Sequence, residues 1–236
     1  MSLDVLRHQD EVRFAREELR ARGLSCADGW LATAANRLRL RRAPLVGDVR
    51  KSWDVLKTAR FIEQHIVKDE LVLDLGARGS EMLPILDRMG YRRLVGIDLD
   101  PSVTAMPSAD RIDYRTGDFR RTGLDPGTCA AITAISVIEH GYDGDGLFRE
   151  VGRLLRPGGS FVASFDYWPA KLNTDAVRLF GMSWQIFSTD EVQQLFQDAR
   201  RFGLEPWGEL HPQATGPLVH FEGRDYTFAW LALRKV

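Results

Sequence analysis

Residues 71–80 read Leu71-Val72-Leu73-Asp74-Leu75-Gly76-Ala77-Arg78-Gly79-Ser80, and this stretch decides the fold. Its apolar start has the length of a buried strand, and the glycines that follow predict a tight turn. Apolar side chains then recur at spacings of three and four until Gly90, a pattern typical of a helix that ends at a glycine; they are Met82, Ile85, Leu86 and Met89. The stretch therefore predicts a strand–turn–helix unit.

A second apolar run, Leu94-Val95-Gly96-Ile97-Asp98, begins four residues after Gly90. Two strands joined through a helix are expected to lie parallel and to be connected by a right-handed crossover. A parallel sheet is normally covered by helices on both faces. The two runs therefore predict the centre of an α/β domain.

The same alternation of patterns continues on both sides of this unit. A helical pattern from Val55 to Ile66 precedes it, and strands are expected at residues 112–115, 130–136 and 160–165. A further helix should contain Leu147, Val151 and Leu154. A doubly wound α/β sheet is the simplest explanation of this order.

The end of the chain shows two further local signals. Ser188-Thr189-Asp190-Glu191 is a capping box, so we expect a helix that begins at Ser188. Residues 226–233 predict a late strand, with residues 204–210 as its partner. The expected fold class is α/β, a Rossmann-like doubly wound and mostly parallel sheet with a C-terminal antiparallel hairpin strand. Residues 1–50 are expected to be an N-terminal helical extension of a domain at residues 51–236.

Composition argues against several classes of protein. The chain has 236 residues, 44% hydrophobic and 28% charged, with a formal net charge of −1, which does not indicate a nucleic-acid partner. It has neither an apolar stretch long enough to span a membrane nor a signal-peptide pattern, so we expect a cytoplasmic protein. Cys26 and Cys129 lack the spacing of a zinc site, and we predict no required metal. The basic run Arg37–Arg42 fits either a solvated helix face or a cradle for an acidic substrate.

The candidate chemistry lies where the predicted strands end. Ligands of open α/β sheets bind at the carboxyl ends of the strands, at the point where the strand order reverses. Gly76 and Gly79 would let the backbone approach a ligand closely, although both glycines could also serve only the turn. Asp98 ends the second strand at a spacing where an acidic side chain accepts hydrogen bonds from both hydroxyls of a ribose. Together these features predict a nucleoside site.

Several motifs together resemble the class I S-adenosylmethionine-dependent methyltransferases. They are residues 72–80, Gly96-Ile97-Asp98, Gly117-Asp118-Phe119, Ile138-Glu139-His140 and Leu155-Arg156-Pro157-Gly158-Gly159. The resemblance covers roughly residues 70–165 and implies S-adenosylmethionine as cofactor. Arg78 and Ser80 depart from the family, since they stand where its second and third turn glycines are expected.

The resemblance also implies a set of cofactor-binding residues. The glycine turn would hold the amino acid end of the cofactor, Asp98 its ribose, and Asp118 and Phe119 would flank the adenine. The full set of expected cofactor-binding residues is Asp74, Gly76, Ala77, Gly79, Asp98, Leu99, Gly117, Asp118, Phe119 and Ser136.

A narrower resemblance concerns the acceptor. Lys51-Ser52-Trp53-Asp54, Gly79-Ser80-Glu81 and Asp166-Tyr167-Trp168-Pro169 are similar to methyltransferases associated with bacterial polysaccharide or other glycan assembly. This similarity implies O-methylation of a sugar, a glycan or another small-molecule acceptor.

Methyl transfer to a hydroxyl requires alignment of the reacting atoms and removal of a proton. His140 follows the fourth strand and is the first candidate base, with Glu139 orienting it or contacting the cofactor, and Asp166 is the second candidate. His140 could equally shape the pocket through local hydrogen bonds. Tyr167, Trp168 and Trp184 are candidates for an aromatic wall against a sugar, and Trp53 for a cover over the cofactor, although core packing explains each of these side chains as well.

Two other classes of protein stay open at this point. A nicotinamide-dependent oxidoreductase could use a similar sheet, but no full Gly-x-Gly-x-x-Gly motif follows the first strand. A catalytically silent cofactor-binding or scaffold protein would result if Arg78 and Ser80 blocked the turn.

Overall fold

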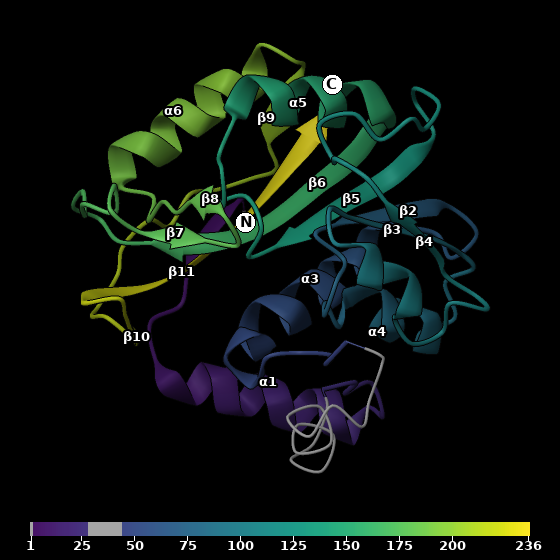
Figure 1. Cartoon of the computed structure of the whole chain (residues 1–236), viewed down its shortest axis with the longest axis horizontal. Coiled ribbons are helices and arrows are strands. Elements are labelled where there is room, and N and C mark those ends of the chain that lie inside the picture. Colours follow the sequence, from purple (N-terminus) through teal and green to yellow (C-terminus); the bar gives the residue numbers. More distant parts are fainter. Residues whose placement is uncertain (1, 28–43) are drawn as a thin grey trace.

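The computed structural model describes residues 2–27 and 44–236. The basic run Arg37–Arg42 lies outside the described residues, as does part of the expected extension at residues 1–50. The described chain forms three layers, with a mixed sheet between two groups of helices (Figure 1). The predicted fold class is therefore confirmed.

Within the described residues the central sheet has nine strands, in the order β1-β11-β6-β5-β2-β3-β4, with β9 and β10 also paired to β11. Strands β2 to β6 run parallel to one another. Strand β11 is antiparallel to β6, and β1, β9 and β10 are antiparallel to β11. The bounds are β1 Leu3–Val5, β2 Leu71–Leu75, β3 Arg93–Asp98, β4 Asp113–Thr116, β5 Cys129–Ile135, β6 Leu155–Tyr167, β9 Leu204–Pro206, β10 Val219–Phe221 and β11 Arg224–Lys235.

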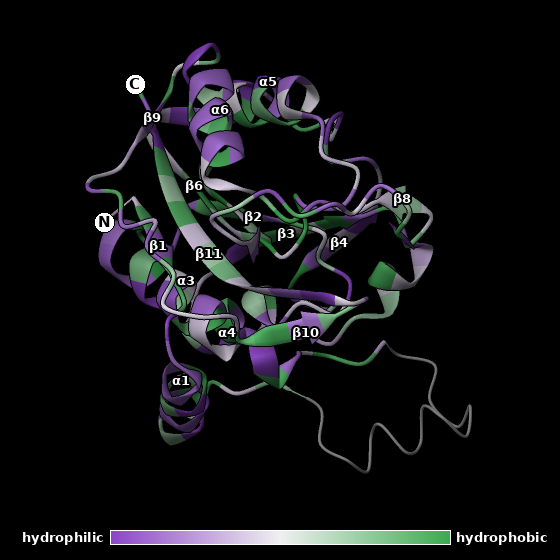
Figure 2. Ribbon diagram, turned by 90° about the vertical axis from the view of Figure 1, so that its left-hand side faces the viewer, coloured by the Kyte–Doolittle hydropathy of each residue, from purple (hydrophilic) through white to green (hydrophobic). Residues whose placement is uncertain are grey.

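Helices cover both faces of this sheet, as Figures 1 and 2 show from two directions. One face carries α5 (Gly144–Leu154) and α6 (Thr189–Arg200), and the other carries α1 (Gln9–Ala21), α3 (Ser52–His65) and α4 (Met82–Arg88). Because both faces are covered, all five residues of β2 are buried. The short elements are the 3-10 helices η1 (Val49–Lys51) and η2 (Pro101–Ala105) and the hairpin of β7 (Arg178–Leu179) and β8 (Met182–Ser183).

The N-terminal segment belongs to the sheet and is not a purely helical extension. Strand β1 pairs with β11, and the Ser2 hydroxyl donates a hydrogen bond to the carbonyl of Ala232 at 2.7 Å. Helix α1 packs against α3 through its apolar face, which includes Val12 and Leu19. No strand was expected here, because Leu3–Val5 is too short for a period of two to be recognised.

The C-terminal region follows the prediction in outline and differs in detail. The expected late strand is β11, but its long partner is β6, with eight aligned residue pairs from Thr227↔Tyr167 to Arg234↔Ser160. Strand β9 pairs only with the last residues of β11, while β10 forms the hairpin with its start. Strand β6 begins at Leu155, earlier than expected, because residues 156–159 form an irregularity in the pairing with β5.

The helix predicted at Ser188 is confirmed. The Ser188 hydroxyl accepts from the backbone N–H of Glu191, and the Glu191 carboxylate accepts from the backbone N–H of Ser188 at 2.9 Å. These two bonds satisfy amide groups that the first turn of a helix leaves without partners. The same helix places Val192, Leu195 and Phe196 in the core beneath it.

Gly96 on β3 has no room for a side chain. A Cβ there would lie 2.7 Å from Tyr114 Cδ1, 2.8 Å from Ala77 Cβ and 2.9 Å from Leu83 Cδ1. We therefore expect Gly96→Ala to lower the free energy of unfolding by about 1–3 kcal/mol, the usual cost of overpacking. Denaturant unfolding followed by circular dichroism measures the difference.

The matched control is Gly216→Ala, because a Cβ at Gly216 would meet no heavy atom within 4 Å. That variant should change the free energy of unfolding by less than about 1 kcal/mol in either direction. Equal stability of the Gly96→Ala variant and the native chain would contradict the proposed close packing of β3 against α4.

Candidate functional site

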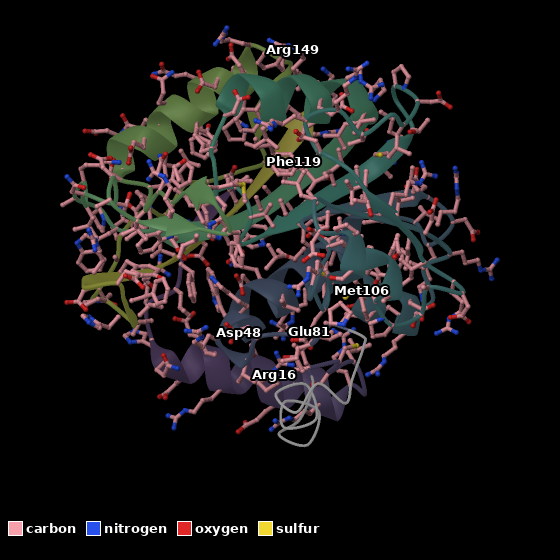
Figure 3. All side chains as sticks on the ribbon, in the orientation of Figure 1. Arg16, Asp48, Glu81, Met106, Phe119 and Arg149 are labelled. Atoms are coloured by element: carbon pink, nitrogen blue, oxygen red, sulfur yellow. The ribbon has the colours of Figure 1, made fainter. Side chains whose placement is uncertain are left out.

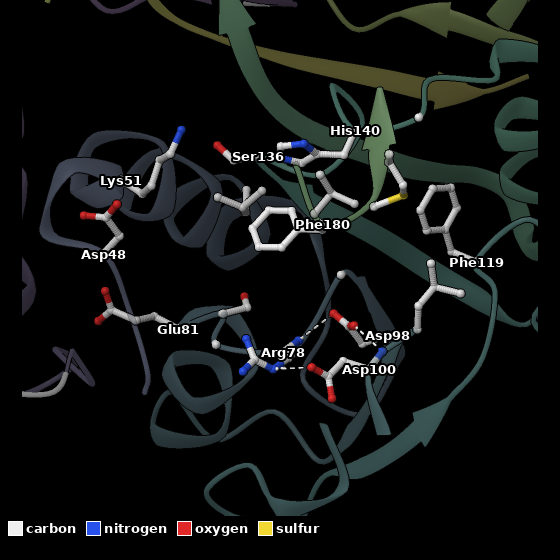
Figure 4. A pocket seen from close by; sticks show the side chains of 18 of the residues that line it. Asp48, Lys51, Arg78, Glu81, Asp98, Asp100, Phe119, Ser136, His140 and Phe180 are labelled. Atoms are coloured by element: carbon white, nitrogen blue, oxygen red, sulfur yellow. Dashed lines mark hydrogen bonds and ion pairs between the residues drawn. The ribbon is translucent and has the colours of Figure 1, made fainter. Parts of the chain in front are cut away.

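The main cavity lies at the carboxyl ends of β2, β3 and β5, where the order of the sheet reverses. This is the position at which open α/β sheets bind their ligands. The cavity has a volume of about 890 Å³, and Figure 4 shows the side chains around it. Its walls come from the glycine turn, the ends of β3 and β5, η1 with the residues before it, and the β7–β8 hairpin.

The glycine turn is held in one conformation by its neighbours. Gly76 and Gly79 have φ angles of 67° and 76°, which side-chain-bearing residues rarely adopt. The backbone N–H groups of Gly76 and Ala77 both donate to the carbonyl of Ile97 on β3, at 2.9 and 3.1 Å. A Cβ on Gly76 would also collide with the side chain of Val137. The turn thus needs glycine for its backbone angle and for its closeness to the segment after β5.

Asp98, the last residue of β3, lies beside this turn. Its carboxylate accepts from the backbone N–H of Arg78 at 3.0 Å and from that of Asp100 at 2.8 Å. The Arg78 guanidinium forms an ion pair with Asp100 at 2.9 Å and a hydrogen bond with Ser102, which fixes its direction (Figure 4). Arg78 therefore replaces the expected glycine without unfolding the turn, and both Arg78 and Ser80 line the cavity.

The predicted cofactor residues separate into two groups. One group lines the cavity: Gly76, Gly79, Asp98, Leu99, Asp118, Phe119 and Ser136. The other does not line it: Asp74 and Ala77 are buried, and Gly117 is half-buried. Ser136 stands out in the first group, because it has a φ of 52° without being glycine, and its buried hydroxyl oxygen has no partner in the described residues.

Asp74 supports the turn from below. It is fully buried, and its Oδ1 accepts from the Thr133 hydroxyl at 2.6 Å, whereas Oδ2 has no partner in the described part of the chain. Burial removes the carboxylate from water and raises the pKa of Asp74 to about 7, despite the opposing hydrogen bond from Thr133. Asp74 thus joins β2 to β5 rather than lining the cavity.

A group of buried ionisable side chains lies beside the cavity, where β5 and β6 end. It contains two predicted catalytic residues, Glu139 and Asp166, together with Lys51 and Asp54. The Lys51 ammonium lies 3.7 Å from Asp166 Oδ1 and 3.3 Å from the centre of the Phe228 ring. Of this group, Lys51 lines the cavity (Figure 4).

Two carboxyl groups of this cluster, those of Asp54 and Glu139, are hard to ionise. Burial raises the pKa of Asp54 to about 6, although Lys51 and the Ser164 hydroxyl, 2.7 Å away, favour the charged form. Burial and the neighbouring charge of Asp166 raise the pKa of Glu139 well above its usual range. Glu139 Oε2 has no partner among the described residues. The sequence marked Asp54 only as part of a motif, since nothing local shows that it reaches β6.

His140 is the predicted catalytic residue that reaches the cavity. Burial lowers the pKa of His140 and so favours the neutral imidazole, while the nearby Asp166 opposes this effect. Its Nδ1 is buried without a partner in the described chain, and its ring packs edge-on against Phe180 at a centroid distance of 5.2 Å. Asp166 is held separately, because its Oδ2 accepts from the Trp184 indole at 2.8 Å.

The expected aromatic wall is formed by other residues. Tyr167, Trp184 and Trp53 are buried in the core, Trp168 packs against it, and none of the four lines the cavity. Tyr167 even faces the side of the sheet covered by α6, where its hydroxyl donates to the carbonyl of Pro212. These four assignments are corrected: core packing, the alternative interpretation, describes the positions of these rings.

Sequence reasoning missed the residues that form the apolar wall. Phe180 and Met182, from the β7–β8 hairpin, line the cavity beside His140, and Phe180 is 82% exposed (Figure 4). Gly181 was a possible sequence signal for this hairpin. In its turn both Phe180 and Gly181 have positive φ angles.

A buried ion pair between Glu81, which belongs to a predicted motif, and Arg16, which does not, also supports the cavity. The guanidinium of Arg16 donates to both carboxylate oxygens of Glu81, at 2.6 and 2.9 Å, and both side chains are nearly inaccessible. Figure 3 shows the pair between α1 and the start of α4, and Glu81 lines the cavity. Residues 65 positions apart give no sequence signal for such a contact.

Among residues 2–27 and 44–236, no group of three or more His, Cys, Asp or Glu side chains is arranged to hold a metal ion. None of the helices in the described segments is long and apolar enough to cross a membrane.

Part of this chain is similar to known methyltransferases. Residues 73–163 match the model of a family described as a methyltransferase domain. The ubiquinone biosynthesis O-methyltransferase of Xanthomonas campestris is 29% identical over 107 residues, which is 42% of this chain and 44% of that protein. A protein of Mycolicibacterium smegmatis named as a probable S-adenosylmethionine-dependent methyltransferase is 35% identical over 75 residues, 31% of this chain and 29% of that protein. The matches thus span less than half the length of either relative.

Solved structures agree in fold. The geranyl diphosphate C-methyltransferase of Streptomyces coelicolor, in complex with S-adenosyl-L-homocysteine, has a TM-score of 0.57 at 20% identity, covering 77% of this chain and 80% of that one. An S-adenosylmethionine-dependent methyltransferase of Mesorhizobium loti has a TM-score of 0.53 at 17% identity, covering 78% and 98%. The resemblance to class I methyltransferases that the sequence indicated is confirmed.

The buried carboxyl of Asp74 predicts a pH effect on stability. Its pKa is about 7 in the folded chain and near 3.8 when exposed, so the folded state holds a proton that the unfolded state releases. This contribution to stability is complete below about pH 4 and disappears as the pH rises towards 7. Asp74→Asn keeps an acceptor for Thr133 but cannot ionise, so its unfolding free energy should fall less between pH 4 and 7, by on the order of 1.4 kcal/mol for each pKa unit.

Denaturant unfolding at several pH values measures this slope. The matched control is Asp113→Asn, an exposed carboxylate on β4, which should keep the slope of the native chain. Parallel stability curves for the native chain and Asp74→Asn would refute the raised pKa.

Proposed function

We propose that this class I methyltransferase transfers the methyl group of S-adenosylmethionine to a hydroxyl oxygen of a small-molecule acceptor, with sugar and glycan hydroxyls as the acceptor class. One observation carries the proposal. A single cavity joins the left-handed glycine turn and the Asp98 carboxylate at one end to the His140 imidazole at the other. A cofactor with a ribose and a reactive methyl group fits this distribution of groups.

The cofactor half of the proposal rests on Asp98, the turn and two apolar side chains. The Asp98 carboxylate would accept hydrogen bonds from the two ribose hydroxyls, and the turn at Gly76 and Gly79 leaves room for the amino acid end of the cofactor. Leu99, which is 53% exposed, and Phe119 would enclose the adenine. The geranyl diphosphate C-methyltransferase binds S-adenosyl-L-homocysteine on the same fold, which supports this arrangement.

The acceptor half rests on His140. The acceptor oxygen would attack the methyl carbon in line with the carbon–sulfur bond, so that an O–C bond forms, the C–S bond breaks and S-adenosyl-L-homocysteine leaves. The hydroxyl proton would pass to the imidazole, which burial favours in the neutral form required of a base. Asp166 lies close enough to favour the imidazolium that results.

Two observations bear on the acceptor class. The matching ubiquinone biosynthesis enzymes are O-methyltransferases, which supports an oxygen acceptor. The sugar or glycan assignment rests on the resemblance of the segments at Lys51–Asp54 and Asp166–Pro169 to glycan-associated methyltransferases. Phe180 and Met182 supply the apolar surface against which such an acceptor would lie.

Asp98→Ala tests the cofactor site. Loss of two charge-assisted hydrogen bonds, each worth about 1.5–3 kcal/mol, should weaken S-adenosylmethionine binding at least about a hundredfold. Isothermal titration calorimetry measures the dissociation constant. Asp113→Ala, at the exposed edge of the sheet, is the control and should bind as the native chain does. If the Asp98→Ala variant bound S-adenosylmethionine with native affinity, Asp98 would not contact the cofactor.

His140→Ala tests the chemistry. General-base catalysis contributes about a hundredfold to ten-thousandfold, so kcat should fall by that order while the dissociation constant for S-adenosylmethionine stays within a few-fold. Formation of S-adenosyl-L-homocysteine with a panel of sugar and phenol acceptors measures kcat between pH 6 and 9. A near-native kcat across this range would mean that His140 is not the general base. Either Asp166 would then accept the proton, or alignment of the reacting atoms would be sufficient for the reaction.

A further inference from the structure

We propose that a second cavity, on the other side of α3 from the methyl-transfer site, binds a sugar ring. This second cavity has a volume of about 810 Å³ and lies between α1, α3 and the start of the segment after β9. It shares no lining residue with the first cavity. Helix α3 separates the two, because Val55 lines the first cavity while Trp53 and Phe61 line the second.

The wall of the second cavity is aromatic and rigid. Phe61 packs edge-on against Trp207 at 5.4 Å and against Trp230 at 5.8 Å, and His65 lies 5.0 Å from Trp207. Phe14 on α1 completes the wall and is 59% exposed. Rings that fix one another in this way offer apolar surface without losing side-chain freedom when a ligand binds. The CH face of a pyranose is a ligand surface that packs on such rings.

Hydrogen-bond donors lie in the same wall. Within residues 2–27 and 44–236, the indole N–H groups of Trp53 and Trp207 donate no hydrogen bond; Trp53 is 8% exposed and Trp207 is half-buried. The Trp230 indole differs, since it donates to the Thr58 hydroxyl at 2.9 Å. Gln64, exposed at the rim, adds an amide that can both donate and accept. A ligand for this wall therefore needs hydroxyl groups around an apolar face.

The charges around the cavity exclude other ligands. Two acidic side chains, Asp10 and Glu11, and two basic ones, Lys57 and Arg60, line it, so the charges balance. The Lys57 ammonium is already bound to Asp4 at 2.6 Å, and Arg60 forms an ion pair with Glu18. Among the described residues that line this cavity, a phosphate or nucleotide would find no excess of positive charge, whereas a neutral sugar has no such requirement.

Tryptophan fluorescence tests the proposal directly, because Trp53, Trp207 and Trp230 are three of the six tryptophans in the chain. We would titrate the full chain with the methyl glycosides of glucose, galactose, mannose and rhamnose and follow the emission. At least one should give a saturable change. Trp207→Ala should weaken this binding at least tenfold, and Gln64→Ala, an exposed change that leaves the core intact, several-fold.

Two controls keep the test independent of the proposed reaction. Trp168→Ala removes a part-buried tryptophan outside the second cavity and should keep native sugar binding. S-adenosylmethionine affinity, measured in parallel, should be native in every variant. Absence of a saturable change with any glycoside, or equal loss in Trp168→Ala, would overturn the proposal without affecting the methyl-transfer site. Light scattering compares the oligomeric state of Trp207→Ala with that of the native chain. A difference between the two would overturn the proposal and indicate that this cavity is an interface between two copies of the chain.

Discussion

The close approach of the glycine turn to the segment after β5 is the constraint on which the rest of the structure depends. The backbone of Gly76 lies so near the Val137 side chain that no Cβ fits between them, and the turn is bonded to the carbonyl of Ile97 on β3. Three adjacent strands are therefore fixed relative to one another at their carboxyl ends. The Asp98 carboxylate, the Ser136 hydroxyl and the His140 imidazole all follow these strand ends, so their separation is set by backbone geometry rather than by flexible loops.

A second feature of the site is its excess of buried acid. Asp54, Glu139 and Asp166 surround the single ammonium of Lys51, so full ionisation of the cluster would leave uncompensated negative charge in a poorly hydrated place. The raised pKa values of Asp54 and Glu139 reduce this charge, because each carboxyl group keeps its proton to a higher pH than an exposed one does. Lys51 contacts Asp166 and also lines the cavity, so it connects the buried acids to the space that a ligand would occupy.

The sequence predicted what is local and missed what is assembled from distant segments. The unit at residues 71–98, the capping box at Ser188 and the position of Asp98 each depend on signals within a few residues, and the structure has them where they were expected. The Arg16–Glu81 pair and the burial of Tyr167 depend on which helix covers which face, and periodicity does not carry that information. Tyr167 was assigned to the cavity because it follows a strand end, but alternate residues of a strand face opposite sides of the sheet.

The pairing of β1 with β11 has a consequence for how the chain folds during synthesis. Residues 3–5 are synthesised before the other strands that the structure describes, whereas their partners at residues 229–231 belong to the last of those strands. Until then the edge of β6 stays open, because β11 is the strand that separates it from β1. An unpaired strand edge of this kind is where nascent chains associate wrongly. The order of synthesis thus makes the pairing of β11 the step that covers the open edge of β6.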